Sequence, residues 1–265
     1  MAAGGRTLRI DGHVHGAPRR FRGSPAAYVK KIRKAGIHAV VLIEGGETVL
    51  AARRRFGDFV IPVARVPMDR SGPGDVERLL DAGCPGIKFI RPLHPYSDER
   101  YWPLYEVLEK RRAVAVFHTG YLGFGRREER PINMQHMRAA EIDTLTRHFS
   151  DLKVVMAHFS NPWWEEAWKI TWTRKNVYAD LSGGTAFTRS TAMWTEMFAP
   201  DGRRLPGSLE KLTFASDVDY FHGRPHNFQP YLDFYERILD RVQAPASLRR
   251  KIWGATLVRL FGLKI

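Results

Sequence analysis

The sequence is poor in cysteine: its 265 residues contain only one, Cys84. An internal disulfide framework and a zinc module built from cysteines are therefore excluded, and a reducing, cytoplasmic setting is expected. Long hydrophobic runs are also missing, since none approaches the roughly 18–20 residues that a helix needs to cross a bilayer. The first residues lack the continuous apolar core of a signal peptide. The sequence thus predicts a cytoplasmic protein with no membrane partner.

Two glycine-rich phosphate-binding patterns are absent as well. The first expected strand leads into Asp11-Gly12-His13-Val14-His15, which is not G-x-G-x-x-G, and G-x-x-x-x-G-K-[ST] occurs nowhere. These absences exclude the usual dinucleotide-binding and P-loop classes. With 44% hydrophobic and 12% aromatic residues, the chain is also too apolar to be disordered.

Acidic residues are scarce relative to basic ones, with 28 Asp and Glu against 42 Lys and Arg and a formal net charge of +14. Such a balance can indicate a nucleic-acid partner. The excess is scattered in short groups such as Arg53-Arg54-Arg55 and Arg249-Arg250-Lys251, which is typical of solvated helix faces. No nucleic-acid partner is therefore expected, and a catalytically silent barrel that binds nucleic acid stays a remote alternative.

Short apolar, β-branched runs alternate along the chain with longer amphipathic runs, which is typical of a parallel sheet with crossover helices. Eight such units predict an α/β protein of the (β/α)8 TIM-barrel class, one domain over residues 1–265 with an extra C-terminal helix. An open doubly wound sheet is the alternative. The predicted strands are Thr7–Ile10, Ala39–Ile43, Phe59–Val66, Gly86–Ile90, Ala113–Phe117, Lys153–Ala157, Val177–Leu181 and Leu212–Ala215. The predicted helices are Ser24–Ala35, Glu47–Arg55, Asp75–Ala82, Glu99–Arg112, Arg138–Phe149, Trp163–Arg174, Thr191–Phe198, Tyr231–Val242 and a closing helix, Leu248–Phe261.

Functional side chains of a TIM barrel gather at the C-terminal ends of its strands. His13 and His15 lie at the end of the first strand, and residues i and i+2 of a strand share a face, so both can converge on one ion. His118, His158 and Asp217 follow the fifth, sixth and eighth strands. Imidazole and carboxylate ligands together suit zinc or a similar divalent ion with one position open for water.

Four further residues are candidates for binding a substrate. Lys88 and Arg65, on the fourth and third strands, are expected to contact an anionic group. A carbamylated Lys88 bridging two metals is the alternative; an unmodified lysine and a single ion are favoured. Trp163 could form an aromatic wall with Trp164, unless they pack beneath a helix. His222, in the loop after the eighth strand, could face the pocket.

As an ordered set, these motifs resemble the amidohydrolase superfamily, and within it the amidohydrolase-related (amidohydrolase 2) branch of metal-dependent TIM-barrel hydrolases and decarboxylases. The resemblance covers almost the whole chain. Thr256 stands where the family usually has Asn, and Asp219-Tyr220 shifts its usual Ser-Asp-Tyr-Pro pattern. The motifs that carry the resemblance are Ile10–His15, Gly86–Phe89, Val116–Gly120, Val154–Phe159, Val177–Ser182, Phe214–Asp217 and Ile252–Leu263.

The resemblance implies that His13, His15, His118 and Asp217 bind one divalent ion, Zn²⁺ in the first place and Mn²⁺ or another ion otherwise. It implies hydrolysis of an amide, ester or lactone-type bond in a small anionic or aromatic substrate by zinc-activated water. Asp217 would take the proton of that water, and His158 would polarise the substrate or transfer a proton. A non-oxidative decarboxylase of an aromatic or unsaturated carboxylic acid needs the same ligands and is the alternative. A homo-oligomer is left open.

Overall fold

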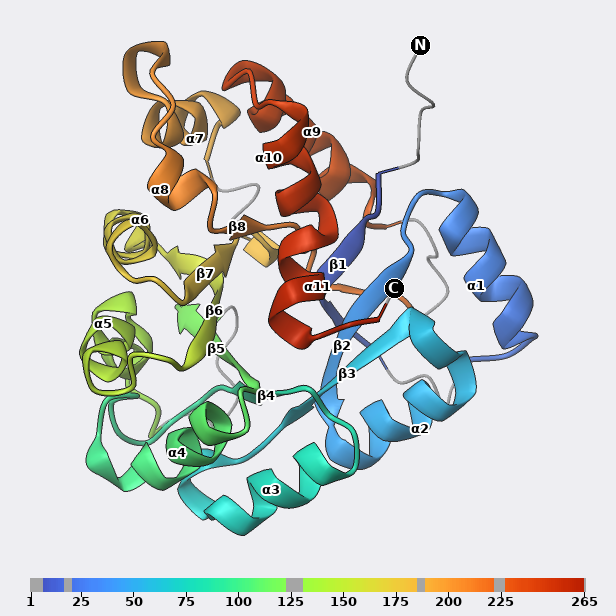
Figure 1. The fold of residues 1–265 in the computed structure, drawn as a ribbon, viewed down its shortest axis with the longest axis vertical. Coiled ribbons are helices and arrows are strands. Elements are labelled where there is room, and N and C mark those ends of the chain that lie inside the picture. The colour runs from blue at the N-terminus through green and yellow to red at the C-terminus, as the bar shows by residue number, and fades with distance from the viewer. Residues whose placement is uncertain (1–6, 17–20, 123–130, 185–188, 222–226, 265) are drawn as a thin grey trace.

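In the computed structural model, parallel strands form a barrel with helices packed around it (Figure 1). The structure describes residues 7–16, 21–122, 131–184, 189–221 and 227–264. No helix among these residues is both long enough and apolar enough to cross a membrane. The described strands are β1 (Ile10–His15), β2 (Ala39–Gly45), β3 (Val60–Arg65), β4 (Gly86–Phe89), β5 (Val114–Gly120), β6 (Lys153–Asn161), β7 (Val177–Asp180), β8 (Leu212–Thr213) and β9 (Val218–Asp219). The described helices are α1 (Pro25–Lys34), α2 (Gly46–Phe56), α3 (Pro73–Asp81), α4 (Trp102–Lys110), α5 (Ala139–His148), α6 (Trp164–Thr173), α7 (Thr191–Phe198), α8 (Pro206–Leu209), α9 (Gln229–Arg241), α10 (Ala246–Arg250) and α11 (Thr256–Phe261).

The barrel closes between β1 and the eighth strand. β8 and β9 are two short pieces of that strand on either side of residues 214–217; β8 pairs with β7, and β9 pairs with β1. Between the two pieces, the Gly12 amide donates to the Phe214 carbonyl at 2.9 Å, and the Asp217 amide donates to the His13 carbonyl at 2.7 Å. These bonds join the two ends of the sheet, so the predicted TIM barrel is confirmed.

Successive side chains of a strand point to opposite faces of the sheet, so each strand contributes to two separate apolar cores. In β2, Val40 and Leu42 belong to the outer core, between the strands and the helices, whereas Val41 and Ile43 point into the barrel. The inner core also contains Leu257, Leu260 and Phe261 of α11. Lys153, the first residue of β6, donates from Nζ to the Leu260 carbonyl at 3.2 Å. The extra C-terminal helix thus closes the amino-terminal end of the barrel.

Three of the predicted elements differ most from the structure. The first strand was expected at Thr7–Ile10, but β1 begins at Ile10 because residues 10–15 pair with β2 on one side and with the eighth strand on the other. The eighth strand, expected as one run at Leu212–Ala215, is split into β8 and β9.

The closing helix, expected as continuous over Leu248–Phe261, is interrupted by a π-helical turn at Lys251–Ala255. At that turn a Cβ on Gly254 would lie 2.9 Å from the Leu8 carbonyl oxygen. The backbones of the closing helix and the N-terminal segment therefore approach each other closely. All three differences depend on contacts between distant parts of the chain, which a local sequence pattern does not register.

Gly120, the last residue of β5, provides a test of this packing. Its φ is +95°, and a Cβ there would lie 2.1 Å from the Asn161 carbonyl oxygen of β6. We expect Gly120→Ala to lower the free energy of unfolding by about 2–5 kcal/mol, because backbone strain and steric overlap add. Gly74→Ala in α3 is the control, since outside its own helix no described atom lies within 4 Å of its Cβ position; a change of about 1 kcal/mol or less is expected there. Denaturant unfolding measures both, and equal losses would contradict the assignment.

Candidate metal centre

Three donor atoms meet at the C-terminal end of the barrel. His13 Nε2 lies 3.2 Å from His15 Nε2 and 3.4 Å from Asp217 Oδ1, and His15 Nε2 lies 3.0 Å from the same oxygen. Tetrahedral ligands at about 2.0–2.2 Å from a zinc ion are separated by about 3.3–3.6 Å. The spacing and the chemistry of these donors therefore fit a divalent cation.

The protonation of the three residues also suits a cation. Burial holds the pKa of His13 well below its ordinary value, and the charge of Lys88 acts in the same direction. Burial also lowers the pKa of His15, but hydrogen bonds to Asp217 and Glu44 outweigh it and raise the pKa to about 9. Burial raises the pKa of Asp217, but the hydrogen bond from His15 outweighs it and the net pKa is lowered. A cation would thus displace the proton that His15 shares with a charged carboxylate.

His158 lies between His13 and His118. Its ring centroid is 5.1 Å from that of His13 and 4.7 Å from that of His118. The Nε2 atom of His118 lies 3.2 Å from the carbonyl oxygen of Tyr121, and His118 is not among the three residues whose donor atoms meet. Burial lowers the pKa of both His118 and His158. The structure therefore places His118 beside the centre, one imidazole away from His13.

The side chains of His158 and Asp217 extend from residues with a left-handed backbone conformation. His158, Phe159 and Ser160 have φ values of +67°, +47° and +54°, and Asp217 has φ +64°. Such values cost about 1–2 kcal/mol for a residue with a Cβ. The conformation at the end of β6 is stabilised by hydrogen bonds from the His158 amide to Asp180 Oδ1 and from the Ser160 amide to Thr119 Oγ1, both 3.0 Å long.

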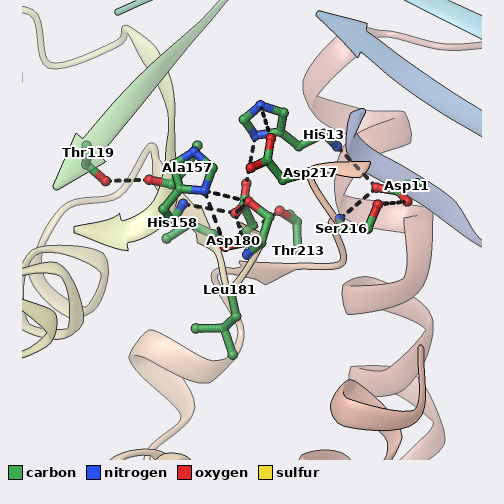
Figure 2. A network of polar contacts seen from close by, with 12 residues as sticks. Asp11, His13, Thr119, Ala157, His158, Asp180, Leu181, Thr213, Ser216 and Asp217 are labelled. Carbon is green, nitrogen blue, oxygen red and sulfur yellow. Dashed lines mark hydrogen bonds and ion pairs between the residues drawn. The ribbon is translucent and has the colours of Figure 1, made fainter. Parts of the chain in front are cut away.

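Asp11 links β1 to the turn that carries Asp217 (Figure 2). Its Oδ1 accepts hydrogen bonds from the His13 and Ser216 amides at 3.3 and 2.9 Å, and its Oδ2 accepts from the Ser216 and Tyr220 hydroxyls at 2.6 and 3.0 Å. Burial raises the pKa of Asp11 to about 7, against the effect of these hydrogen bonds. Sequence reasoning gave Asp11 no role, although a carboxylate two residues before His13 on an apolar strand was a usable signal.

Asp180, the last residue of β7, is a second buried carboxylate without a predicted role. Its Oδ1 accepts from the His158 amide at 3.0 Å (Figure 2). The same oxygen accepts from the Ser182 amide at 3.0 Å and from the Ser182 hydroxyl. Its Oδ2 lies 4.0 Å from Nδ1 of His13. The signal in the sequence was again a carboxylate at the end of an apolar strand.

Lys88 and Arg65 are register neighbours on β4 and β3. Lys88 is buried, and no hydrogen-bond partner of its Nζ lies in the described part of the chain. Burial lowers its pKa to about 8, while the charges of Asp180 and Asp217 act against burial. Arg65 is exposed and lines a cavity of about 510 Å³ together with Arg70 and other residues of the same rim, among them Met68, Arg91, Leu93 and Ile132.

The aromatic residues after β6 divide between two roles. Trp163 stacks on Tyr121, with ring centroids 5.2 Å apart and an interplanar angle of 30°. The guanidinium carbon of Arg138 also lies over the Trp163 ring, 4.6 Å from its centroid. Tyr121 is 54% exposed. Trp164 is buried and packs edge-on against Trp194. Trp163 thus belongs to an aromatic pair next to His118, Trp164 belongs to the core, and His222 lies outside the described residues.

A family model described as Amidohydrolase matches residues 10–263, nearly the whole chain. The chain belongs to the amidohydrolase family. The resemblance drawn from the ordered motifs is thereby confirmed.

The barrel of this amidohydrolase-family chain is shared by several solved structures. An uncharacterized TIM-barrel protein, Bb4693 from Bordetella bronchiseptica, is 16% identical with a TM-score of 0.68, covering 96% of this chain and 98% of that one. A putative 2-pyrone-4,6-dicarboxylic acid hydrolase from Pseudomonas putida is 18% identical with a TM-score of 0.65, covering 98% and 99%. The 5-carboxyvanillate decarboxylase from Sphingomonas paucimobilis is 12% identical with a TM-score of 0.65, covering 97% and 99%. No curated protein matches the chain in sequence.

Gly183 and Gly184 offer a matched test of the geometry of this amidohydrolase-family site. A Cβ on Gly183 would lie 2.7 Å from Asp217 Oδ2 and 3.3 Å from His158 Nδ1, whereas a Cβ on Gly184 would have no neighbour within 4 Å among the residues that the structure describes. We expect Gly183→Ala to displace Asp217 and weaken Zn²⁺ binding about 10–100-fold, the range found when groups supporting a ligand are altered. Gly184→Ala should bind Zn²⁺ like the unaltered protein. Competition with a chelating dye measures both affinities, and equal affinities would contradict the geometry.

Proposed function

We propose that this protein is a metal-dependent hydrolase that cleaves an amide, ester or lactone-type bond of a small anionic substrate. The observation that carries the proposal is the convergence of His13 Nε2, His15 Nε2 and Asp217 Oδ1 within 3.0–3.4 Å of one another at the C-terminal end of the barrel. Membership of the amidohydrolase family supports an enzymatic role. A solved structure of the same fold, a putative 2-pyrone-4,6-dicarboxylic acid hydrolase, is consistent with this class of reaction.

His13, His15 and Asp217 would hold one divalent ion, Zn²⁺ in the first place and Mn²⁺ otherwise, with His118 of β5 as a fourth ligand. When bound, the cation supplies Lewis acidity, which makes water acidic near neutral pH and polarises substrate oxygens. Asp217, whose net pKa is lowered, is charged and available to accept the proton of the attacking water and pass it to the leaving group. His158, beside His13, is the second proton-transferring residue.

The surroundings of the centre favour a substrate with a negative charge. Lys88 presents a buried amine beside the centre, and Arg65 continues the same row of residues toward the rim. The cavity lined by Arg65, Arg70 and Arg91 is of the size typical of small-molecule sites. Trp163 and Tyr121 would form an aromatic wall near His118. His222 remains a proposed substrate contact outside the described residues.

Non-oxidative decarboxylation is the second candidate, because the same ligands serve it. The arginine-lined cavity favours a carboxylic acid as substrate, and solved structures of the same fold include a 5-carboxyvanillate decarboxylase and a 2,6-dihydroxybenzoate decarboxylase. In that reaction a proton is delivered to carbon as the carbon–carboxyl bond breaks and CO₂ leaves. His158 and Asp217 are the proton-transferring residues nearest to the centre.

The two reactions are separated by their products. The protein is loaded with Zn²⁺ and incubated with lactones, esters and amides, which release acid on hydrolysis, and with aromatic and unsaturated carboxylic acids, which release CO₂ on decarboxylation. We expect acid release without CO₂, and a metal content of one ion per chain by elemental analysis. Release of CO₂ alone would establish the decarboxylase, and two ions per chain would favour a bridging, modified Lys88.

Asp217 and His158 should respond differently to substitution. Asp217→Asn is expected to abolish turnover even where some metal remains bound, because an amide cannot accept a proton at neutral pH. His158→Asn should keep the metal while kcat falls about 10²–10³-fold. Metal content and kcat are measured on the same samples. Loss of metal from His158→Asn would make His158 a ligand, and full activity of Asp217→Asn would refute water activation by Asp217.

Arg65 should act on substrate binding. We expect Arg65→Ala to raise KM about 10–100-fold with little change in kcat, since a charge-assisted hydrogen bond contributes about 1.5–3 kcal/mol. Arg78→Ala is the control: Arg78 is exposed on α3 and pairs with Asp75. Steady-state kinetics with the best substrate of the panel measures both variants. Equal KM values for the two variants would exclude Arg65 from the substrate site.

A further inference from the structure

Asp180, Ser182 and His158 form a chain of hydrogen bonds behind the candidate metal centre. The Ser182 hydroxyl donates to Asp180 Oδ1. The same hydroxyl oxygen lies 3.0 Å from His158 Nδ1, and the Ser182 carbonyl oxygen lies 3.3 Å from that nitrogen. Ser182 and Asp180 are fully buried, so solvent does not compete for these contacts.

The donors and acceptors of this chain determine where the proton of His158 lies. A hydroxyl group has a single hydrogen, and Ser182 gives it to Asp180. A carbonyl oxygen can only accept. Both oxygens beside His158 Nδ1 are therefore acceptors, and Nδ1 must carry the hydrogen. In a neutral imidazole the other nitrogen, Nε2, then carries a lone pair and no hydrogen.

The second oxygen of Asp180 faces the other imidazole. Asp180 Oδ2 and His13 Nδ1 are 4.0 Å apart, both are buried, and neither has a hydrogen-bond partner in the described part of the chain. The field of the carboxylate favours a proton on the nitrogen that faces it, Nδ1. His13 Nε2, which faces His15 and Asp217, is then left as a lone-pair donor. Carboxylates behind metal-binding histidines commonly fix the tautomer in this way.

We propose that Asp180, acting directly on His13 and through Ser182 on His158, sets the tautomers of both histidines so that each presents an unprotonated Nε2. Asp180 and Ser182 are thus positioning residues. His158 is then a proton acceptor in the reaction and not a hydrogen-bond donor to a substrate oxygen. The role of His158 as a proton acceptor rests on the proposed function. The assignment of the two tautomers does not depend on that function.

Nitrogen-15 NMR reports the tautomers without any substrate. Long-range ¹H–¹⁵N correlation spectra of the ¹⁵N-histidine-labelled chain distinguish Nδ1–H from Nε2–H, and His13→Gln and His158→Gln variants assign the two rings. Spectra are recorded before and after removal of bound metal by a chelator. We expect Nδ1–H for both rings under both conditions. An Nε2–H form at either histidine would overturn the proposal, even if the protein proves to be a hydrolase.

Asp180→Asn tests the carboxylate with almost no change of shape. Because Oδ1 of Asp180 accepts three hydrogen bonds, the amide oxygen of the variant takes that place and its NH₂ group faces His13 Nδ1. A donor there turns Nδ1 into an acceptor. We expect His13 to switch to Nε2–H and Zn²⁺ affinity to fall about 10–100-fold. Unchanged tautomers and unchanged affinity would overturn the proposal.

Two controls separate this effect from general destabilisation. Asp143→Asn removes a carboxylate that pairs with Arg147 and Arg174 on the outer helices, and it should leave Zn²⁺ affinity and both tautomers unchanged. Ser182→Ala should shift the Nδ1 resonance of His158 and leave that of His13 in place. Ser208→Ala removes a buried hydroxyl that contacts only Thr171 in the described contacts, and neither resonance should move. Equal shifts in the two serine variants would contradict the relay.

Discussion

The closure of the barrel between β1 and the eighth strand is the constraint on which the site depends. The backbone bonds Gly12–Phe214 and His13–Asp217 bring together residues that are about 200 positions apart in the chain. The same pairing carries the side chain of Asp217 to the two imidazoles of β1. Asp11 reinforces it with hydrogen bonds from both strands. Assembly of the ligand set and completion of the barrel are therefore one event.

Buried charge at this end of the barrel is compensated locally. Lys88 is accompanied by Asp180 and Asp217, and Asp11 accepts hydrogen bonds from amides and hydroxyls. An isolated buried charge would cost several kcal/mol, and partners reduce that cost. The result is a polar cluster surrounded by apolar strands, with donors and acceptors already oriented before a ligand arrives. Such preorganisation is the usual physical basis of electrostatic catalysis.

Much of the architecture could be predicted from the sequence, because strand and helix periodicities are local and the alternation of the two is typical of one fold. The positions of His13, His15 and Asp217 at the ends of predicted strands also indicated a metal site, and the structure brings their donor atoms together. Asp11 and Asp180 were not assigned roles, since their importance lies in partners from other strands. His118 could be placed on its strand but not oriented. Its contact with the Tyr121 carbonyl depends on the local backbone, which no side-chain pattern encodes.

The helix that closes the amino-terminal end of the barrel has a consequence for biosynthesis. Leu257, Leu260 and Phe261 of α11 complete a core to which Ile10 and Val41 also contribute, although the two groups are more than 200 residues apart in the chain. The earliest strands leave the ribosome with inward-facing apolar side chains whose partners have not yet been made. A native topology dominated by such distant contacts folds slowly. We therefore expect the strands that are made first to be prone to aggregation until residues 257–261 have left the ribosome.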